Sequence, residues 1–290
     1  MTDFPRCDED KFNKWLVDEY FKHGSVDEVL KSHNFDVPIS YAQYQRILDK
    51  WGVVKAAGPN NKLTEALDFF YHLAEKNIPL EDLYKRMPTS FRTSAATMYR
   101  ILSYIKEGVT RRMGAALIIT PHNDPERVLV ARDVSVPRME LGKPYNSLSI
   151  PMGFSRKRDP REDAILRVLQ QEVFMQQAID RNMPKIIPQR PKPFMFLDIA
   201  DVRVEVFHIT LPGKWLNPNN FSSYKLKNHK FISIKNLNHL KKKNHLRAGV
   251  FEAISSYKKY RDLKKRKLSI NPLQCKSDLN YFIVENNFNR

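Results

Sequence analysis

The chain has few residues of the kinds that build covalent or metal-bound frameworks. Its 290 residues include two cysteines, Cys7 and Cys275, which lie far apart in the sequence. Lone and distant cysteines predict neither a disulfide framework nor a zinc motif, and the eight histidines show no metal-ligand spacing. We therefore expect a reducing compartment and no bound cofactor.

Glycine and long apolar segments are also scarce. Nine glycines form no glycine-rich loop of the kind that cradles phosphates. No apolar run approaches the roughly 18 residues needed to span a membrane, and no signal peptide is recognisable. The expected location is the cytoplasm, without a membrane partner.

Basic residues are abundant but unevenly distributed. Lys+Arg number 49 against 32 Asp+Glu, which gives a formal net charge of +17. Residues 1–110 hold 15 basic and 16 acidic residues, whereas residues 225–267 alone hold 15 basic and 2 acidic. Such a segment is expected to contact phosphates in a salt-dependent manner, although lysine-rich ends can be merely solubilising. The candidate phosphate contacts are Lys241, Lys242, Lys243, Lys264, Lys265 and Arg266.

The first 110 residues show a helical pattern that repeats with an offset of 54 residues. SYAQYQRIL at 40–48 aligns with SAATMYRIL at 94–102, and VDEVLK at 26–31 aligns with LEDLYK at 80–85. One ungapped offset that serves several segments indicates an internal repeat. Each copy predicts three helices, at 9–23, 25–33 and 40–52, and again at 63–76, 79–87 and 94–107.

The last helix of each copy begins at a serine, Ser40 or Ser94, whose hydroxyl can cap a helix N-terminus. A capped third helix after two others resembles a helix-turn-helix unit, in which that helix enters the DNA major groove. Two units in tandem resemble the bipartite DNA-binding regions of regulators, recombinases and transposases. The alternative is a helical protein-docking module whose polar residues face solvent. Because Arg and Gln can pair with base edges and Lys with phosphate, the candidate DNA-binding residues are Gln43, Arg46, Lys50, Arg92, Thr97 and Arg100.

Residues 153–175 combine glycine, acidic residues and arginine at fixed spacings. Pro160, followed by helix formers, predicts a helix over residues 161–174, on which positions 168, 171 and 172 share one face. The segment resembles the Nudix box of the Nudix hydrolase superfamily. The matching positions are Gly153, Asp159, Arg167, Leu169 and Glu172.

Most residues that would hold a metal in the resembled family are replaced. There, the shared helix face carries carboxylates that hold Mg²⁺ or Mn²⁺ against a diphosphate. Val168 and Gln171 replace two of them here, and Glu172 remains. One carboxylate beside an amide and an aliphatic group is a poor site for a hard cation, so the resemblance implies impaired or absent hydrolysis. Asp159 and Arg167 can still form the ion pair that fixes the loop before the helix.

The segments around the box predict a mixed domain. GAALIIT (114–120) and RVLVAR (127–132) predict two paired strands, and residues 194–211 predict a strand pair with a turn near Ala200. The expected fold class is α+β, with all-α tandem helix-turn-helix-like repeats, then a Nudix-like α/β/α sandwich and a basic C-terminal helix and tail. The expected domains are 1–58, 59–110, 111–262 and a tail at 263–290. A strand at 229–237 and a helix at 246–260 complete the sandwich, and the last twenty residues form either a docked strand or a mobile tail.

The leading hypothesis is a sequence-specific DNA-binding protein, either a transcriptional regulator or a DNA-processing accessory factor, associated with the nucleoid. The chain resembles Nudix-related transcriptional regulators, so its Nudix-like domain would be a scaffold, a homodimerisation surface or a sensor of a nucleotide-type ligand. One alternative is a non-catalytic subunit of a larger nucleoprotein complex. The other is an active hydrolase of nucleoside diphosphate derivatives that uses Mg²⁺, with Glu172 as the metal ligand helped by Asp159, Glu162, Asp163, Asp198 or Glu205.

Overall fold

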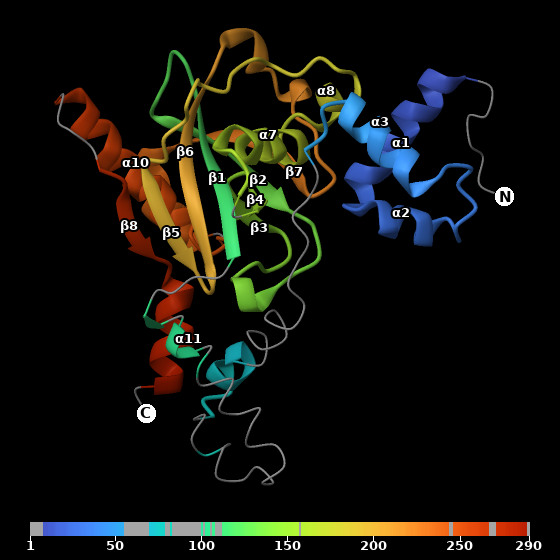
Figure 1. Ribbon diagram of the computed structural model, residues 1–290. Coiled ribbons are helices and arrows are strands. Elements are labelled where there is room, and N and C mark those ends of the chain that lie inside the picture. Colours follow the sequence, from blue (N-terminus) through green and yellow to red (C-terminus); the bar gives the residue numbers. More distant parts are fainter. Residues whose placement is uncertain are drawn as a thin grey trace.

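Two β-sheets form the centre of the chain in its computed structural model (Figure 1). The structure describes residues 8–54, 70–78, 82, 100, 102–104, 106–107, 112–156, 158–243, 246–266 and 271–288, and of residues 242–243 and 284–288 it describes the backbone only. The five-stranded sheet has the order β4 (Met152–Ser155), β1 (Arg112–Pro121), β6 (Val202–Leu211), β5 (Met195–Ile199), β8 (Leu273–Lys276). The three-stranded sheet has the order β3 (Ser147–Ser149), β2 (Arg127–Asp133), β7 (Leu226–Ser233).

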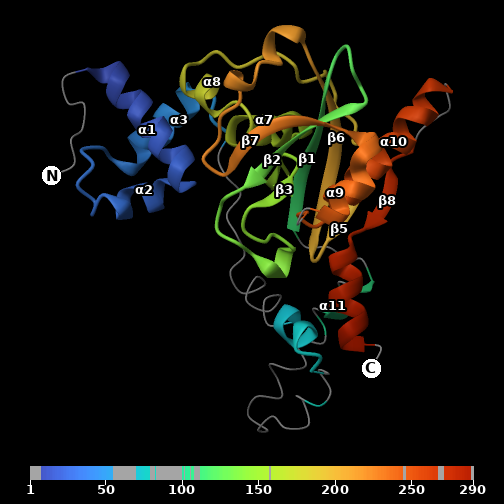
Figure 2. The same cartoon turned by 180° about the vertical axis from the view of Figure 1, so that it is seen from behind.

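Alternate side chains of β1 enter two separate hydrophobic cores, because successive residues of a strand face opposite sides of the sheet. Ala116 and Ile118 lie in the core that contains residues of α10 (Val250–Lys265). Leu117 lies in the other core, which contains residues of α7 (Arg161–Glu172). Figure 2 shows the sheets between these helices. The expected mixed α+β architecture and its layering are therefore present.

The expected pairing of the strands at 114–120 and 127–132 is wrong. β1 pairs with β4 and runs parallel to β6, whereas β2 pairs with β3 and β7 in the other sheet. The turn between them is present, with the Asp124 carboxylate accepting from the Glu126 amide. Almost every residue of β1 is buried, and a strand covered on both faces suits a position inside the sheet, where the ten-residue β6 and the short β4 flank it. Burial of both faces of β1 therefore favours its place in the five-stranded sheet over the expected hairpin with β2.

Other expected elements are present with shifted boundaries. β5 and β6 form the expected antiparallel pair around Ala200, which adopts a left-handed φ of 50°. The box helix α7 ends two residues early, because the Phe174 amide turns back to the Leu169 carbonyl (2.7 Å) and a new helix, α8 (Met175–Ile179), begins. α10 begins at Val250, later than expected, after Gly249 in a left-handed conformation.

The last residues form a docked strand and a helix. β8 runs parallel to β5, and α11 (Asp278–Phe288) follows it directly. Leu279 and Ile283 of α11 belong to the same core as α10. Other short elements among the described residues are α9 (Leu237–Lys243) and the 3-10 helices Met139–Leu141, Gly213–Trp215, Pro218–Asn220 and Ile234–Asn236.

The first helices of the described chain lie close to the positions expected for the first repeat. They are α1 (Glu9–His23), α2 (Val26–Ser32) and α3 (Tyr41–Lys50). Ser40 caps α3 by accepting from the Gln43 amide at 3.2 Å, and the Tyr44 hydroxyl donates to the Leu16 carbonyl at 2.6 Å. The core of these helices is completed by residues of α8, so this unit packs against the sheet-bearing part of the chain.

The second copy of the repeat lies mostly outside the described residues. Arg92, Thr97 and the cap Ser94 are among those not described, whereas residues 70–75 are helical. Phe70 and Leu102 are fully buried in the core shared with α10 and α11. Their counterparts 54 residues earlier, Leu16 and Leu48, are fully buried in the α1–α3 core. The two copies thus contribute equivalent apolar positions to different cores.

Within the described residues, every helix is too short or too polar to cross a lipid bilayer.

Candidate functional site

The loop before α7 is fixed by an ion pair between Arg167 and Asp159. The guanidinium donates to the carboxylate at 2.5 Å and to the Phe154 carbonyl at 3.4 Å, and the same carboxylate accepts from the Arg156 amide at 3.0 Å. Burial opposes ionisation of Asp159, but these hydrogen bonds outweigh it and hold its pKa below the usual value. The ion pair expected from the box positions is therefore present and has a structural role.

The helix face that would hold a cation contains few oxygen ligands and one ammonium group. Val168 is 2 % exposed and packs in the core below α7. The Lys225 ammonium lies 3.2 Å from the Gln171 side-chain oxygen and 3.9 Å from a carboxylate oxygen of Glu172. Lys225 precedes β7, so the tertiary fold brings it to this face from more than fifty residues away. A positive charge thus lies beside the two polar residues of the face.

Glu172 is a buried carboxylate surrounded by charged groups. Burial raises its pKa, and the positive charges of Lys225 and Arg247 partly oppose that rise. Asp133, itself buried, raises the pKa further. The backbone carbonyl of Glu172 is also engaged, at 2.7 Å from the His229 ring nitrogen Nε2.

These residues do not fit a Mg²⁺ or Mn²⁺ site of the kind implied by the resemblance. Hard cations of this kind require several oxygen ligands, usually including carboxylates. In the described part of the chain, no set of three carboxylate, imidazole or thiolate ligands gathers around Glu172. The Lys225 ammonium would in addition repel a divalent ion.

Three of the five carboxylates suggested as helpers of Glu172 form ion pairs with arginines: Asp159, Asp198 and Glu205. Glu205 forms an ion pair with Arg161 at 2.9 Å, and Asp198 pairs with Arg203 at 2.9 Å. Arg161 is at the start of α7 and Glu172 at its end; at 1.5 Å per residue the two positions are about 16 Å apart. The structure therefore does not bring Glu205 together with Glu172.

A second group of buried charges adjoins Glu172. Arg247 lies 3.3 Å from the Asp133 carboxylate, and the Lys143 ammonium donates to the Ser135 hydroxyl at 2.6 Å. Burial lowers the pKa of Lys143 to about 8, against the opposing attraction of Asp133. The Asp133 carboxylate is thus the partner of both Lys143 and Arg247 in the interior next to α7.

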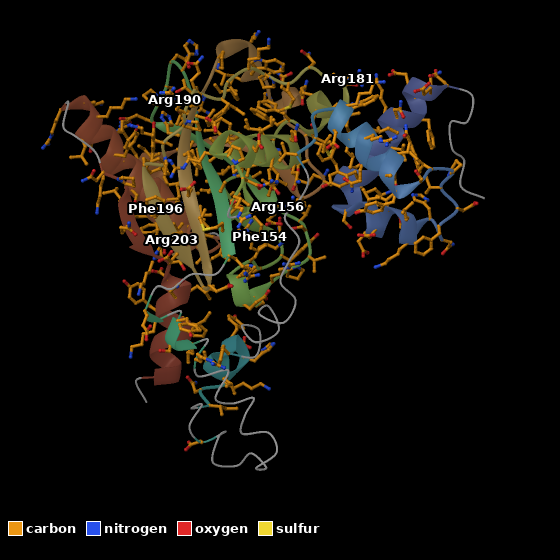
Figure 3. The ribbon with its side chains drawn as sticks, in the orientation of Figure 1. Phe154, Arg156, Arg181, Arg190, Phe196 and Arg203 are labelled. Carbon is orange, nitrogen blue, oxygen red and sulfur yellow. The ribbon has the colours of Figure 1, made fainter. Side chains whose placement is uncertain are left out.

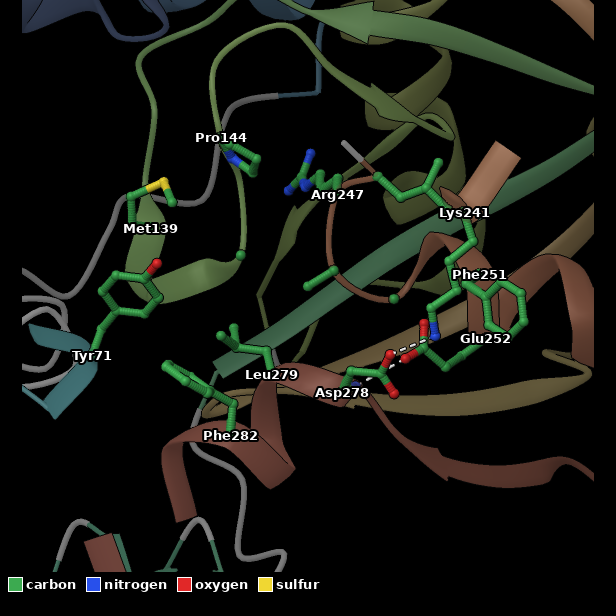
Figure 4. A pocket seen from close by; sticks show the side chains of 14 residues that line it. Tyr71, Met139, Pro144, Lys241, Arg247, Phe251, Glu252, Asp278, Leu279 and Phe282 are labelled. Atoms are coloured by element: carbon green, nitrogen blue, oxygen red, sulfur yellow. Dashed lines mark hydrogen bonds and ion pairs between the residues drawn. The ribbon is translucent and has the colours of Figure 1, made fainter. Parts of the chain in front are cut away.

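Arg247 also lines a pocket of about 440 Å³ on the side of the sheets near α11 (Figure 4). Apolar side chains including Tyr71, Leu279 and Phe282 form part of its wall. The charged part of the wall is internally paired, because Lys241 lies 2.8 Å from the Asp278 carboxylate. The pocket therefore combines an apolar wall with charges that already have partners.

The three expected DNA contacts of the first repeat lie on α3. Gln43, Arg46 and Lys50 are exposed, while Tyr44 and Leu48 of the same helix are fully buried. Positions 43, 46 and 50 are three and four residues apart, so they share one face. The expected outward orientation is present.

The C-terminal end of α3 is attached to the sheet-bearing part by polar and aromatic contacts. The Trp51 indole donates to the Ile179 carbonyl at 3.2 Å, and the Arg181 guanidinium lies 3.5 Å from the centre of the Trp51 ring. Figure 3 shows Arg181 beside the N-terminal helices. The Gln170 side chain donates to the Gly52 carbonyl at 2.7 Å and accepts from the Val54 amide at 3.0 Å. These contacts fix the direction in which α3 presents its exposed face.

The basic residues at the end of α10 lie on the other side of the sheets from α3 (Figures 1 and 2). Lys264, Lys265 and Arg266 are exposed at the end of α10. In both cartoon views α10 and α3 are on opposite sides of the molecule (Figures 1 and 2). Lys241 is partly engaged by Asp278, and the side chains of Lys242 and Lys243 are outside the described residues. The two groups of expected DNA contacts are therefore separated by the sheets.

Two residues with important contacts on α7 were not predicted from the sequence: Lys225, which contacts its polar face, and Gln170, which holds the end of α3. Lys225 has no local pattern that would link it to the box, because its role depends on a contact across the fold. Gln170 has no local signal either, since its two partners precede it by more than a hundred residues.

The scan of family models found no match, and no curated protein matches the chain. Similar solved structures include a Nudix hydrolase from Nitrosomonas europaea, with 13% identity, 57% of this chain and 78% of that chain covered, and a TM-score of 0.38. A MutT protein from Methanosarcina mazei Go1 has 11% identity, coverage of 54% and 96%, and a TM-score of 0.37. An ADP-ribose pyrophosphatase from Streptococcus suis 89-1591 has 12% identity, coverage of 58% and 99%, and a TM-score of 0.36. Such low values carry no inference of function, which rests on the chain's own residues.

Proposed function

We propose that the chain is a sequence-specific DNA-binding protein whose Nudix-like domain does not hydrolyse nucleotides. The observation that carries the proposal is the amphipathic arrangement of α3. Its buried side holds Tyr44 and Leu48, and its exposed side presents Gln43, Arg46 and Lys50. An exposed arginine can pair bidentately with guanine, glutamine with adenine, and lysine with phosphate.

The attachment of α3 supports this function. Contacts of Trp51 and Gln170 hold the helix end against α7 and α8, so the exposed face is presented in a fixed orientation. A helix held in one orientation can enter a groove without losing much conformational freedom on binding. Double-stranded DNA is the proposed partner, and the nucleoid within the cytoplasm the proposed location.

The charges around α7 support a domain without hydrolytic activity. Lys225 stands next to Gln171 and Glu172, where a hydrolase of this kind would need a cation. We assign the domain the role of a scaffold. It would also serve for self-association or for sensing a nucleotide-type ligand.

Selection of bound duplexes from a random library, with the full chain, tests the proposal. We expect an enriched sequence motif, and Arg46→Gln should weaken binding to it by about 5- to 150-fold, the effect of one good base contact. Arg190→Gln is the matched control, because Arg190 is also exposed but lies away from the N-terminal helices (Figure 3). Binding without sequence preference, lost when Lys264, Lys265 and Arg266 are neutralised, would instead indicate a subunit of a nucleoprotein complex.

An assay with ADP-ribose and a dinucleoside polyphosphate tests the second half of the proposal. We expect no turnover in Mg²⁺ or Mn²⁺. Turnover that Glu172→Gln abolishes would establish a hydrolase and overturn the assignment of the domain; Glu28→Gln, at an exposed glutamate of α2, is the control.

A further inference from the structure

Two histidines and a glutamate converge between α1 and the end of α2. Glu19 and His23 are one turn apart on α1, and His33 is the residue that caps the end of α2. The Glu19 oxygen Oε2 lies 2.7 Å from Nε2 of His33 and 3.3 Å from Nε2 of His23. One potential ligand atom from each of the three residues lies within 4.8 Å of the others. Three groups that can donate electron pairs to a metal thus point to one place.

The environment of this cluster is partly closed. The Glu19 side chain is 7 % exposed, while those of His33 and His23 are 13 % and 26 % exposed. The ring of Trp15 lies 5.2 Å from the His33 ring. A half-buried position limits the competition of bulk water and leaves one side through which an ion could enter.

We propose that Glu19, His23 and His33 form a binding site for Zn²⁺. Two imidazole nitrogens and one carboxylate oxygen are a ligand set that Zn²⁺ accepts, with water in the fourth position of a tetrahedron. At Zn–N and Zn–O distances of about 2.0–2.1 Å, tetrahedral ligand atoms are about 3.3 Å apart. The Glu19–His23 pair has this separation, and the Glu19–His33 pair needs to open by about 0.6 Å. Imidazole ligands favour zinc over magnesium.

Lys22 is the positive charge that faces this cluster. Its ammonium lies 3.1 Å from Oε1 of Glu19, whereas both imidazoles approach Oε2. The side chain of Lys22 is 50 % exposed, so it can turn toward solvent when an ion binds. The lysine and the metal would therefore use different oxygens of the same carboxylate.

Zinc at this place would connect α1 to the residue from which the chain turns toward α3. Such a link would stabilise the three-helix unit and hold the connection between α2 and α3. The inference does not depend on DNA binding, because it concerns the cohesion of the helices themselves.

Titration of the chelator-treated full chain with ZnSO₄, followed by calorimetry, tests the site. We expect one ion per chain, and a loss of affinity of at least about tenfold in His23→Gln and in His33→Gln. His72→Gln is the matched control, because His72 also faces a glutamate, Glu75, at 3.3 Å, outside any set of three ligands found among the described residues. Its affinity for zinc should equal that of the original chain.

A measurement on the unaltered chain keeps the test valid if a variant does not fold. Co²⁺ in place of zinc should give the visible absorption of a four-coordinate ion, and X-ray absorption of the zinc form should show two imidazoles. Saturating zinc should also raise the melting temperature by roughly 5 °C. Absence of zinc binding, an absorption spectrum without imidazole ligands, or equal affinity in folded His23→Gln and His33→Gln variants would each overturn the proposal.

Discussion

The Lys225 ammonium donates a hydrogen bond to the Gln171 side-chain oxygen at 3.2 Å, across more than fifty residues of sequence. This contact places the ammonium of Lys225 on the polar face of α7, beside Gln171 and Glu172. The same ammonium is 3.9 Å from Glu172, whose pKa burial raises. The stability of this region should therefore depend on Lys225 and on pH together.

Lys225→Met should destabilise the chain more at pH 8 than at pH 5. Without the ammonium, the pKa of Glu172 rises further. The folded state then loses stability as pH increases through that pKa, because ionised Glu172 keeps only the weaker compensation of Arg247 and Lys143. We expect the free energy of unfolding, measured with urea, to fall by about 1–2 kcal/mol at pH 8, a value reduced for the solvent exposure of Lys225. The control, Lys230→Met on exposed Lys230 of β7, should change little, and an equal loss at both pH values for Lys225→Met would contradict the prediction.

His208 should make the chain sensitive to acid. Burial, with a smaller effect of Lys264, lowers its pKa to about 4, and its Nε2 lies 2.9 Å from the Thr120 hydroxyl. Between pH 6.5 and 4 the unfolded chain binds a proton at this histidine and the folded chain does not, so stability falls as pH falls. His208→Gln should remove about 3 kcal/mol of that loss. Urea unfolding of both proteins at several pH values measures the free energy of unfolding. If that free energy falls equally with pH in both proteins, His208 has no such role.

Gln170 should determine how firmly α3 is attached. Gln170→Ala removes the hydrogen bonds to the Gly52 carbonyl and from the Val54 amide, and we expect a loss of about 1–3 kcal/mol. In this variant, hydrogen exchange of the α3 amides should become faster than in the original chain, while that of the β1 amides should stay the same. Gln176→Ala is the control, because the side-chain amide of Gln176 donates to the exposed carboxylate of Asp180 and takes no part in the attachment of α3. Unchanged exchange in α3 would mean that apolar contacts alone hold the helix.

Gly249→Ala should be far more harmful than Gly52→Ala. Both glycines have left-handed φ angles, of 85° and 65°. A Cβ at Gly249 would lie 2.6 Å from Ile199 and 2.7 Å from Leu197, whereas at Gly52 it would meet no atom within 4 Å. Backbone strain alone should lower the free energy of unfolding by about 1–2 kcal/mol in Gly52→Ala. In Gly249→Ala, crowding should lower it by about 1–3 kcal/mol more. Thermal and urea unfolding compare the two, and equal losses would show that the space around Gly249 adjusts freely.

Local patterns predicted the elements that depend on local forces. The helices of the first repeat follow from amphipathic spacing and from Ser40, whose hydroxyl caps α3 in the structure. The ion pair of Asp159 and Arg167, which the resemblance to the box implies, joins residues eight apart around one helix start. The β5–β6 pair follows from a turn at Ala200 between two β-rich segments. In each case the interacting residues are close in sequence, so their spacing carries the information.

Composition and periodicity record local propensity and burial, and they were enough to predict the helical first segment, the mixed segment after it and a helix face without carboxylates at Val168 and Gln171. Contacts between distant segments needed the folded chain: β1 and β2 join different sheets, Lys225 meets Gln171, and His33 joins Glu19 and His23. Pairing between distant residues depends on which surfaces bury together, and that choice is made by the packing of the whole chain.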